Sequence, residues 1–148
     1  MRMAVLCDCM CACLMWVQGD LFNFNSMISS VTKKNGATNY GAYGCHCGLG
    51  GKGTPKDATD RCCASHDCCY KRLEKRGCGT KSLKKPQTIK LPSGVYFLVI
   101  SANQGYCRSQ LCQCDKTAAY CFAQNLKTYN RKYQFYPNVL CRGKKPSC

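Results

Sequence analysis

The chain has 148 residues, of which 17 are cysteine, and its 22 Lys and Arg against 7 Asp and Glu give a formal net charge of +15. This length predicts one compact domain. Cysteine at more than one residue in ten indicates an oxidising compartment and a fold held by disulfides, which argues against a cytosolic enzyme and against a disordered chain.

Residues 1–19 have the layout of a secretory signal peptide. Arg2 precedes an apolar stretch that ends near Gly19, and we expect cleavage after this glycine. The stretch is shorter than the roughly 20 residues that a membrane span needs, and Asp8 interrupts it. Its removal takes away four cysteines and leaves an odd number, so one thiol is expected to lack a partner. We therefore predict a secreted protein with a single domain over residues 20–148.

The first part of the mature chain predicts a helix followed by a loop. Apolar residues spaced by three and four positions indicate an amphipathic helix: Leu21, Phe24, Ile28 and Val31. Gly36 is expected to stop this helix. Residues 43–53 contain five glycines and predict a loop, because glycine is used where the backbone bends or approaches a ligand closely.

Two further helices are expected, with a different structure between them. A hydroxyl cap at Thr54 followed by Pro55 predicts a helix that starts there and runs to about Arg76. Residues 107–126 lack Gly and Pro and carry an apolar stripe, which predicts a third helix. Both helices are rich in cysteine, so we expect them to be cross-linked side by side. Helix breakers and an extended apolar run within residues 79–105 favour a hairpin or short strands.

A histidine and a carboxylate, His66 and Asp67, lie among four cysteines in the second helix. A zinc site is one interpretation, but secretion and adjacent cysteine pairs favour disulfides. Seen alone, the two residues would be a packed core histidine and an ordinary helix acid. Calcium is a further possibility, because it accepts backbone carbonyls, and the glycine-rich loop can curl several of them toward Asp67.

Four short motifs carry a family resemblance. They are Tyr-Gly-Cys-His-Cys-Gly-Leu-Gly-Gly at 43–51, Asp-Ala-Thr-Asp at 57–60, Cys-Cys-Ala-Ser-His-Asp-Cys-Cys-Tyr at 62–70 and Cys-Gln-Cys-Asp at 112–115. The chain resembles the secreted phospholipases A2 over residues 20–81 and 101–148, and its C-terminal extension resembles the group II branch. The resemblance implies a mainly α, disulfide-rich fold with an N-terminal helix, a calcium loop, two long antiparallel cross-linked helices and a small β-hairpin.

The resemblance also implies a calcium site and an activity. The ligands would be three backbone carbonyls and one carboxylate, those of His46, Gly48, Gly50 and Asp67. The N–H of Gly48 would complete an oxyanion site. The implied reaction is calcium-dependent hydrolysis of the sn-2 acyl ester of glycerophospholipids at membrane interfaces, which releases a fatty acid and a lysophospholipid.

By the same resemblance, His66 would be the general base that deprotonates a water. Asp115 would hold the other ring nitrogen and fix the tautomer, and Tyr70 would support Asp115 through its hydroxyl. Three residues of the first helix resemble the wall of an acyl channel, namely Leu21, Phe24 and Ile28.

The resemblance implies six disulfides, which are Cys45–Cys141, Cys47–Cys63, Cys62–Cys121, Cys68–Cys148, Cys69–Cys114 and Cys78–Cys107. Cys112 is left as the unpaired thiol, in agreement with the odd count. Residues 82–100 depart from the family. Lys85 stands about where a second tyrosine supporting the catalytic acid is usual, and Ile100 stands where a cysteine is usual.

The excess of basic residues predicts attraction to anionic surfaces, at about 1 kcal/mol per nearby basic residue. The only tryptophan, Trp16, lies in the expected signal peptide, so the mature chain has none for anchoring at a membrane interface. We expect a monomer that prefers anionic phospholipid membranes, including the bacterial envelope, and heparan sulfate. Nucleic acid is not expected to be a specific partner.

The alternative function is a non-catalytic cationic protein of the same fold that binds membranes, heparan or a receptor. A third possibility, a disulfide-rich structural or toxin-like module, predicts no calcium dependence. The presence of His66, Asp67 and Asp115 favours the enzyme, because a binding protein has no need of a His–Asp pair or of an acid at the metal position.

Overall fold

The computed structural model describes residues 20–79, 87–90, 92–94, 96–99 and 102–148. The expected signal peptide, residues 1–19, lies outside the described residues, as do the departures from the family at Lys85 and Ile100. Within the described parts of the chain, no helix is both long enough and apolar enough to cross a membrane.

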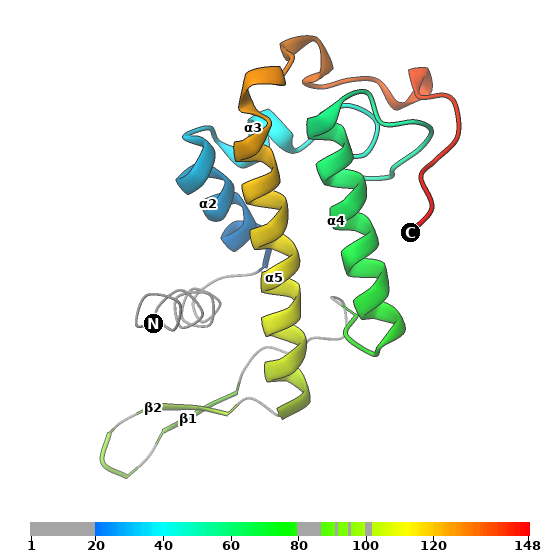
Figure 1. The fold of residues 1–148 in the computed structure, drawn as a ribbon. Helices are drawn as coiled ribbons and strands as arrows, with labels where there is room; N and C mark the ends of the chain where they lie inside the picture. The colour runs from blue at the N-terminus through cyan, green and yellow to red at the C-terminus, as the bar shows by residue number, and fades with distance from the viewer. Residues whose placement is uncertain (1–19, 80–86, 91, 95, 100–101) are drawn as a thin grey trace.

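Two long helices, α4 (Ala58–Lys75) and α5 (Ala102–Gln124), form the body of the protein. They lie side by side and run in opposite directions (Figure 1). Two disulfides join them directly, Cys62–Cys121 and Cys69–Cys114, and a third joins Cys78, three residues after the end of α4, to Cys107 of α5. The prediction of two antiparallel, cross-linked helices is confirmed.

The predicted start of α4 is wrong by several residues, because an aspartate rather than a threonine caps the helix. The Asp57 side chain accepts a hydrogen bond from the N–H of Asp60 at 2.9 Å. Thr54 instead binds the C-terminal segment, with its hydroxyl on the carbonyl of Lys144 and its N–H on the carbonyl of Arg142, both at 3.0 Å. The predicted start of α5 is also wrong, since this helix begins five residues earlier than expected.

The N-terminal helix α2 (Asp20–Thr32) is present where the apolar spacing predicts it, and it packs against α5. The chain leaves this helix through Lys33, which has a φ of 60°. Gly36 does not act as the helix stop but opens a short helix, α3 (Gly36–Tyr40). The side chain of Asn35 caps α3 by accepting from the N–H of Thr38 at 3.0 Å, which is why a helix can begin there.

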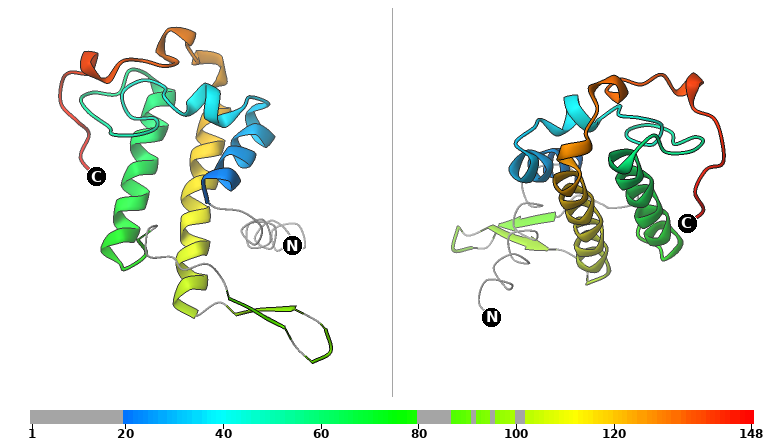
Figure 2. Two further views of the ribbon diagram at one scale, coloured as in Figure 1. Left: turned by 180° about the vertical axis from the view of Figure 1, so that it is seen from behind. Right: turned by 45° about the horizontal axis from the view of Figure 1, so that its top comes forward.

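Two short strands, β1 (Gln87–Lys90) and β2 (Tyr96–Val99), pair in antiparallel fashion between the long helices in sequence. Gln87 lies opposite Val99, and Lys90 lies opposite Tyr96. Figures 1 and 2 show the pair near the N-terminal end of α5, at the opposite end of the molecule from the loop of residues 43–53. The strands therefore take no part in building that loop.

The C-terminal segment passes over one end of the long helices and returns beside α4 (Figures 1 and 2). It contains three short 3-10 helices, η2 (Leu126–Thr128), η3 (Arg131–Tyr133) and η4 (Asn138–Leu140). Two disulfides hold it down, Cys45–Cys141 to the glycine-rich loop and Cys68–Cys148 to α4. This brings the last residues of the chain close to the loop and to the middle of α4.

An aromatic cluster fills the space between α2, α3 and α5. Tyr40 stacks on Phe122 with ring centroids 4.3 Å apart, and Tyr43 and Ile28 are buried in the same cluster. Burial raises the pKa of the Tyr40 phenol to about 12. This core holds α2 against the long helices.

The disulfides described in the structure are those that the family resemblance implies. Besides the five already named, Cys47 is bonded to Cys63. The expectation that Cys112 is unpaired is wrong, because Cys112 takes part in a disulfide.

Candidate active site

The two long helices bring together three side chains that are far apart in the sequence. His66 and Tyr70 lie one turn apart on α4, and Asp115 faces them from α5. The Nε2 of His66 is 2.7 Å from Oδ1 of Asp115, and the hydroxyl of Tyr70 donates to the same oxygen at 2.6 Å. The side chain of Asp115 is 5% exposed and that of His66 is 15% exposed, so the pair is shielded but the imidazole can still be reached.

This hydrogen bonding decides the tautomer of the imidazole. A carboxylate only accepts, so Nε2 of His66 carries the proton and donates it to Asp115. The other nitrogen, Nδ1, then has a free lone pair, and none of the described residues makes a hydrogen bond to it. A histidine held in this way can accept a proton through Nδ1 while the carboxylate stabilises the resulting charge.

A disulfide next to the pair fixes the spacing of the two helices. Cys114 precedes Asp115 on α5 and is bonded to Cys69, which lies three residues after His66 on α4. The bridge therefore stands within one helical turn of both functional side chains. It limits movement of the carboxylate relative to the imidazole.

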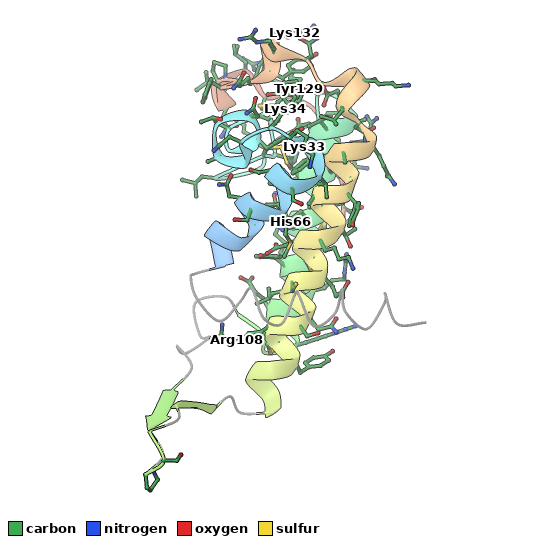
Figure 3. The ribbon with its side chains drawn as sticks, turned by 90° about the vertical axis from the view of Figure 1, so that its left-hand side faces the viewer. Lys33, Lys34, His66, Arg108, Tyr129 and Lys132 are labelled. Carbon is green, nitrogen blue, oxygen red and sulfur yellow. A yellow bond between two sulfur atoms is a disulfide. The ribbon has the colours of Figure 1, made fainter. Side chains whose placement is uncertain are left out.

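The N-terminal helix covers the imidazole. Phe24 stacks on His66 with ring centroids 4.6 Å apart and an angle of 15° between the planes, and Figure 3 shows His66 between α2 and the long helices. Ile28, one turn further on, is buried in the core, 3% exposed. The side chain of Leu21 lies outside the described residues. Of the two whose side chains the structure describes, Phe24 touches the candidate base and Ile28 lies in the core.

The glycine-rich loop is held by a buried carboxylate that the sequence did not single out as functional. Asp60 is fully buried and accepts three backbone hydrogen bonds at 2.8 Å, from the N–H groups of Cys45, His46 and Lys56. A Cβ on Gly44, whose φ is 60°, would lie 2.3 Å from Cγ of Asp60. Only glycine allows the loop to approach this carboxylate so closely.

The side chain of His46 also supports the loop. Its Nε2 donates to the carbonyl of Gly53 at 2.8 Å, and the residue is 2% exposed. The imidazole is thus used for loop packing through Nε2, and this packing fixes the backbone of His46, whose carbonyl is one of the expected ligands. Gly48 and Gly50, the other two expected carbonyl ligands, lie on the exposed part of the loop with φ values of 92° and 106°.

Asp67 lies beside this loop and stands out among the aspartates. A Cβ on Gly51 would lie 3.4 Å from Oδ2 of Asp67, so the loop backbone passes directly over the carboxylate. No hydrogen bond or ion pair with the described residues engages this half-buried carboxylate. Burial raises its pKa, an effect that the nearby His66 and His46 and the ammonium groups of Lys71 and Lys145 oppose only in part.

These features fit a hard cation bound mostly by carbonyl oxygens. Among the described residues, no group of three or more His, Cys, Asp or Glu side chains could hold a metal ion. A single desolvated carboxylate without a partner, next to a loop rich in glycine, is the donor set that calcium accepts when backbone carbonyls supply the rest.

Comparison with known proteins agrees with this arrangement. The family model for phospholipase A2 matches residues 21–134. The chain belongs to the phospholipase A2 family. It is 65% identical over 130 residues to "Phospholipase A2, membrane associated" of Cavia porcellus, covering 88% of this chain and 87% of that one. It is 58% identical over 135 residues to the Homo sapiens protein of the same name, covering 91% and 90%.

A further relative, "Group IID secretory phospholipase A2" of Mus musculus, is 46% identical over 148 residues, the full length of both chains. Together these relatives make the chain a group II-like secreted phospholipase A2. Its disulfides agree with an extracellular protein.

In this phospholipase A2 two supporting residues were missed by reasoning from the sequence. Asp60 anchors the glycine-rich loop, and Asp57 accepts a hydrogen bond from the hydroxyl of Tyr43 at 2.5 Å while capping α4. Both belong to the Asp-Ala-Thr-Asp motif, which served only to support the resemblance. The sequence does carry a signal for them. The chain has only seven acidic residues, and two of these stand three positions apart soon after the glycine-rich loop.

Proposed function

We propose that this phospholipase A2 hydrolyses the sn-2 acyl ester of glycerophospholipids at membrane surfaces in a calcium-dependent reaction, and releases a free fatty acid and a lysophospholipid. The observation that carries the proposal is the pairing of Nε2 of His66 with a shielded Asp115, because it leaves Nδ1 available as a base. A binding protein would have no use for this arrangement.

His66 acts as the general base. Its Nδ1 takes a proton from a water molecule, which then attacks the ester carbonyl without a covalent enzyme intermediate. Asp115 keeps the imidazole in the correct tautomer and stabilises it once it is protonated. The hydroxyl of Tyr70 donates to the same carboxylate oxygen and so fixes its orientation.

The calcium loop and Asp67 complete the site. Bound calcium would polarise the ester carbonyl and balance the charge of the lipid phosphate. Four groups would hold it, the carbonyls of His46, Gly48 and Gly50 and the carboxylate of Asp67. The N–H of Gly48 donates to the ester oxygen as negative charge develops there. The free carboxylate of Asp67 and the raised pKa that burial gives it support this assignment.

The acyl chain lies along the N-terminal helix, where Leu21, Phe24 and Ile28 provide an apolar wall. The stacking of Phe24 on His66 supports this, because it places an apolar surface directly beside the base. A chain bound there brings the ester to the imidazole and keeps bulk water out of that side of the site.

The enzyme is secreted after removal of residues 1–19, acts as a monomer, and docks on anionic membranes, including bacterial envelopes, and on heparan sulfate. The distribution of charge supports this preference. Asp57, Asp60, Asp67 and Asp115 are all at least partly buried, and among the acidic residues whose side chains the structure describes Glu74 is the exposed one. Nearly all of the exposed charged side chains that the structure describes are therefore basic, and Figure 3 shows Lys33, Lys34 and Lys132 around Tyr129.

The test is release of fatty acid from anionic vesicles by the purified protein, with calcium or with a chelator, beside a His66→Gln variant. We expect release only from the unsubstituted protein with calcium present. Equal release with chelator would reject calcium dependence. Binding to vesicles without any release would support the alternative, a non-catalytic cationic protein that binds membranes or heparan.

A further inference from the structure

The C-terminal extension places an ammonium group at the edge of the proposed calcium site. The Nζ of Lys145 donates to the carbonyl of Gly51 at 2.9 Å. A Cβ on Gly51 would lie 3.7 Å from this nitrogen and 3.4 Å from Oδ2 of Asp67. These two distances limit the separation of ammonium and carboxylate to about 7 Å, while no ion pair within 4 Å joins them.

The position of Lys145 is fixed by the fold rather than by a flexible tail. Three residues further on, Cys148 is bonded to Cys68, the neighbour of Asp67 on α4. On the other side, the carbonyls of Arg142 and Lys144 accept hydrogen bonds from Thr54 at the end of the loop. The segment that carries Lys145 is thus attached to both halves of the proposed site.

We infer that the ammonium group of Lys145 is a fixed positive charge at the calcium site. This charge weakens the binding of calcium and thereby sets the calcium concentration that the enzyme needs. The inference rests on the proposed function, because it assumes that calcium binds between the loop and Asp67. An ammonium within about 7 Å of the single carboxylate repels an incoming divalent cation and offsets part of the negative charge that attracts it. Calcium must bind against this repulsion.

The chain offers a matched control next to Lys145. Lys144 carries the same charge one residue earlier and is also exposed, but its contact with the loop uses the backbone carbonyl and survives substitution of the side chain. Lys144→Gln therefore removes one charge from the same segment without removing the ammonium at Gly51. Lys145→Arg keeps the charge at the site, and Lys145→Met keeps the length of the stem without the charge.

The experiment is calorimetric titration of calcium, without lipid, into the unsubstituted protein and the four variants Lys145→Gln, Lys145→Met, Lys145→Arg and Lys144→Gln. We expect the two variants that lose the charge at position 145 to bind calcium about three- to tenfold more tightly, and the other two to change less than twofold. The rise in melting temperature that calcium causes in each of the five proteins gives an independent ranking of their calcium affinities.

Each other outcome overturns the inference. An equal gain for Lys144→Gln and Lys145→Gln would mean that only the net charge of the segment matters. Weaker binding by Lys145→Gln would mean that the ammonium organises the loop for calcium instead of opposing it. If the unsubstituted protein binds no calcium, the proposed function fails together with the inference. The two outcomes above overturn only the inference, because calcium still binds, so the two failures are distinguishable.

Discussion

Three aspartates of this phospholipase A2 differ in their partners, and the partners decide what each carboxylate does. Asp115 accepts from His66 and Tyr70 and is committed to orienting the base. Asp60 accepts three backbone N–H groups and shapes the loop. Asp67 has no such partner among the described residues, and this leaves its charge for a cation.

Replacing the base tests the role of His66 directly. His66→Gln should lower turnover by about 10²- to 10⁴-fold, because general base catalysis contributes a factor of this size. Calcium affinity, measured by calorimetry, and binding to anionic vesicles should stay within twofold, since neither uses Nδ1. Turnover close to that of the unsubstituted enzyme would reject the mechanism.

The buried charge of Asp67 has a consequence for stability in the absence of calcium. Its pKa is raised in the folded protein, so the folded state binds the proton more tightly than the unfolded state does. Stability is therefore lost as the pH rises from about the ordinary value of 3.8 through the raised pKa. Asp67→Asn should remove this loss, bind no calcium, and melt at or above the temperature of the unsubstituted protein at pH 7 in chelator.

Thermal unfolding in chelator at a series of pH values, with Glu74→Gln as an exposed control, measures this effect. If the unsubstituted protein instead gains stability relative to Asp67→Asn as the pH rises across this range, the Asp67 carboxylate has a partner in the folded state and is not available to a cation.

At the scale of elements, the site exists because two helices meet at a fixed distance. His66 comes from α4 and Asp115 from α5, 49 positions later, and the Cys69–Cys114 disulfide lies beside both. The start of α4 is likewise decided by contacts between elements. The hydroxyl of Thr54 looks like a cap in the sequence but binds the C-terminal segment, and Asp57 takes its place.

Removing the disulfide near the site should affect activity more than removing one far from it. The variant with Cys69→Ser and Cys114→Ser should lose about 2–4 kcal/mol of stability and more than tenfold in turnover, because the carboxylate can move relative to the imidazole. The variant with Cys78→Ser and Cys107→Ser loses the bridge that ties the segment just after α4 to the N-terminal part of α5, away from the site. It should lose similar stability but less than threefold in turnover.

Denaturant unfolding and initial rates at saturating calcium, both below the melting temperature, separate the two effects. Equal losses of turnover in the two variants would mean that the bridges act only through overall stability.

At the scale of the whole molecule, charge and apolar groups are distributed unevenly over the surface. Most described acidic side chains are withdrawn from the surface, so the basic residues act almost without compensation. Apolar side chains are exposed close to the calcium loop: Leu49 is 96% exposed and Val139 75%. A hydrogen bond of 3.4 Å from Asn138 to the carbonyl of Leu49 brings these two segments together. The described residues include no tryptophan, but they have exposed apolar side chains next to the glycine-rich loop.

Binding to vesicles should therefore depend strongly on salt. Affinity for anionic vesicles should fall steeply as salt is added, and binding to phosphatidylcholine vesicles should be weak at all salt concentrations, because exposed charges act over only about 8 Å at physiological ionic strength. Vesicle sedimentation with the unsubstituted protein and with Leu49→Ser measures both contributions. Strong, salt-independent binding to phosphatidylcholine that Leu49→Ser abolishes would show that these exposed apolar side chains dock the enzyme and that charge does not.

The sequence by itself determined the features that depend on short-range patterns. Apolar spacing predicts α2 from Leu21 to Val31, the glycines of residues 43–53 predict the loop, and the motif around His66 identifies the family. Each is readable because helix periodicity, backbone freedom and motif spacing are local properties of the chain.

Only the tertiary structure decided which groups meet. The choice of Nε2 of His66 for Asp115, the N–H groups of Cys45 and His46 on Asp60, and the approach of Lys145 to Gly51 all join residues 14 to 94 positions apart. No local pattern specifies such contacts, because they depend on how helices pack and where disulfides hold the C-terminal segment. The residues of the candidate site can therefore be read from the sequence. The distances between them are set only when the chain folds.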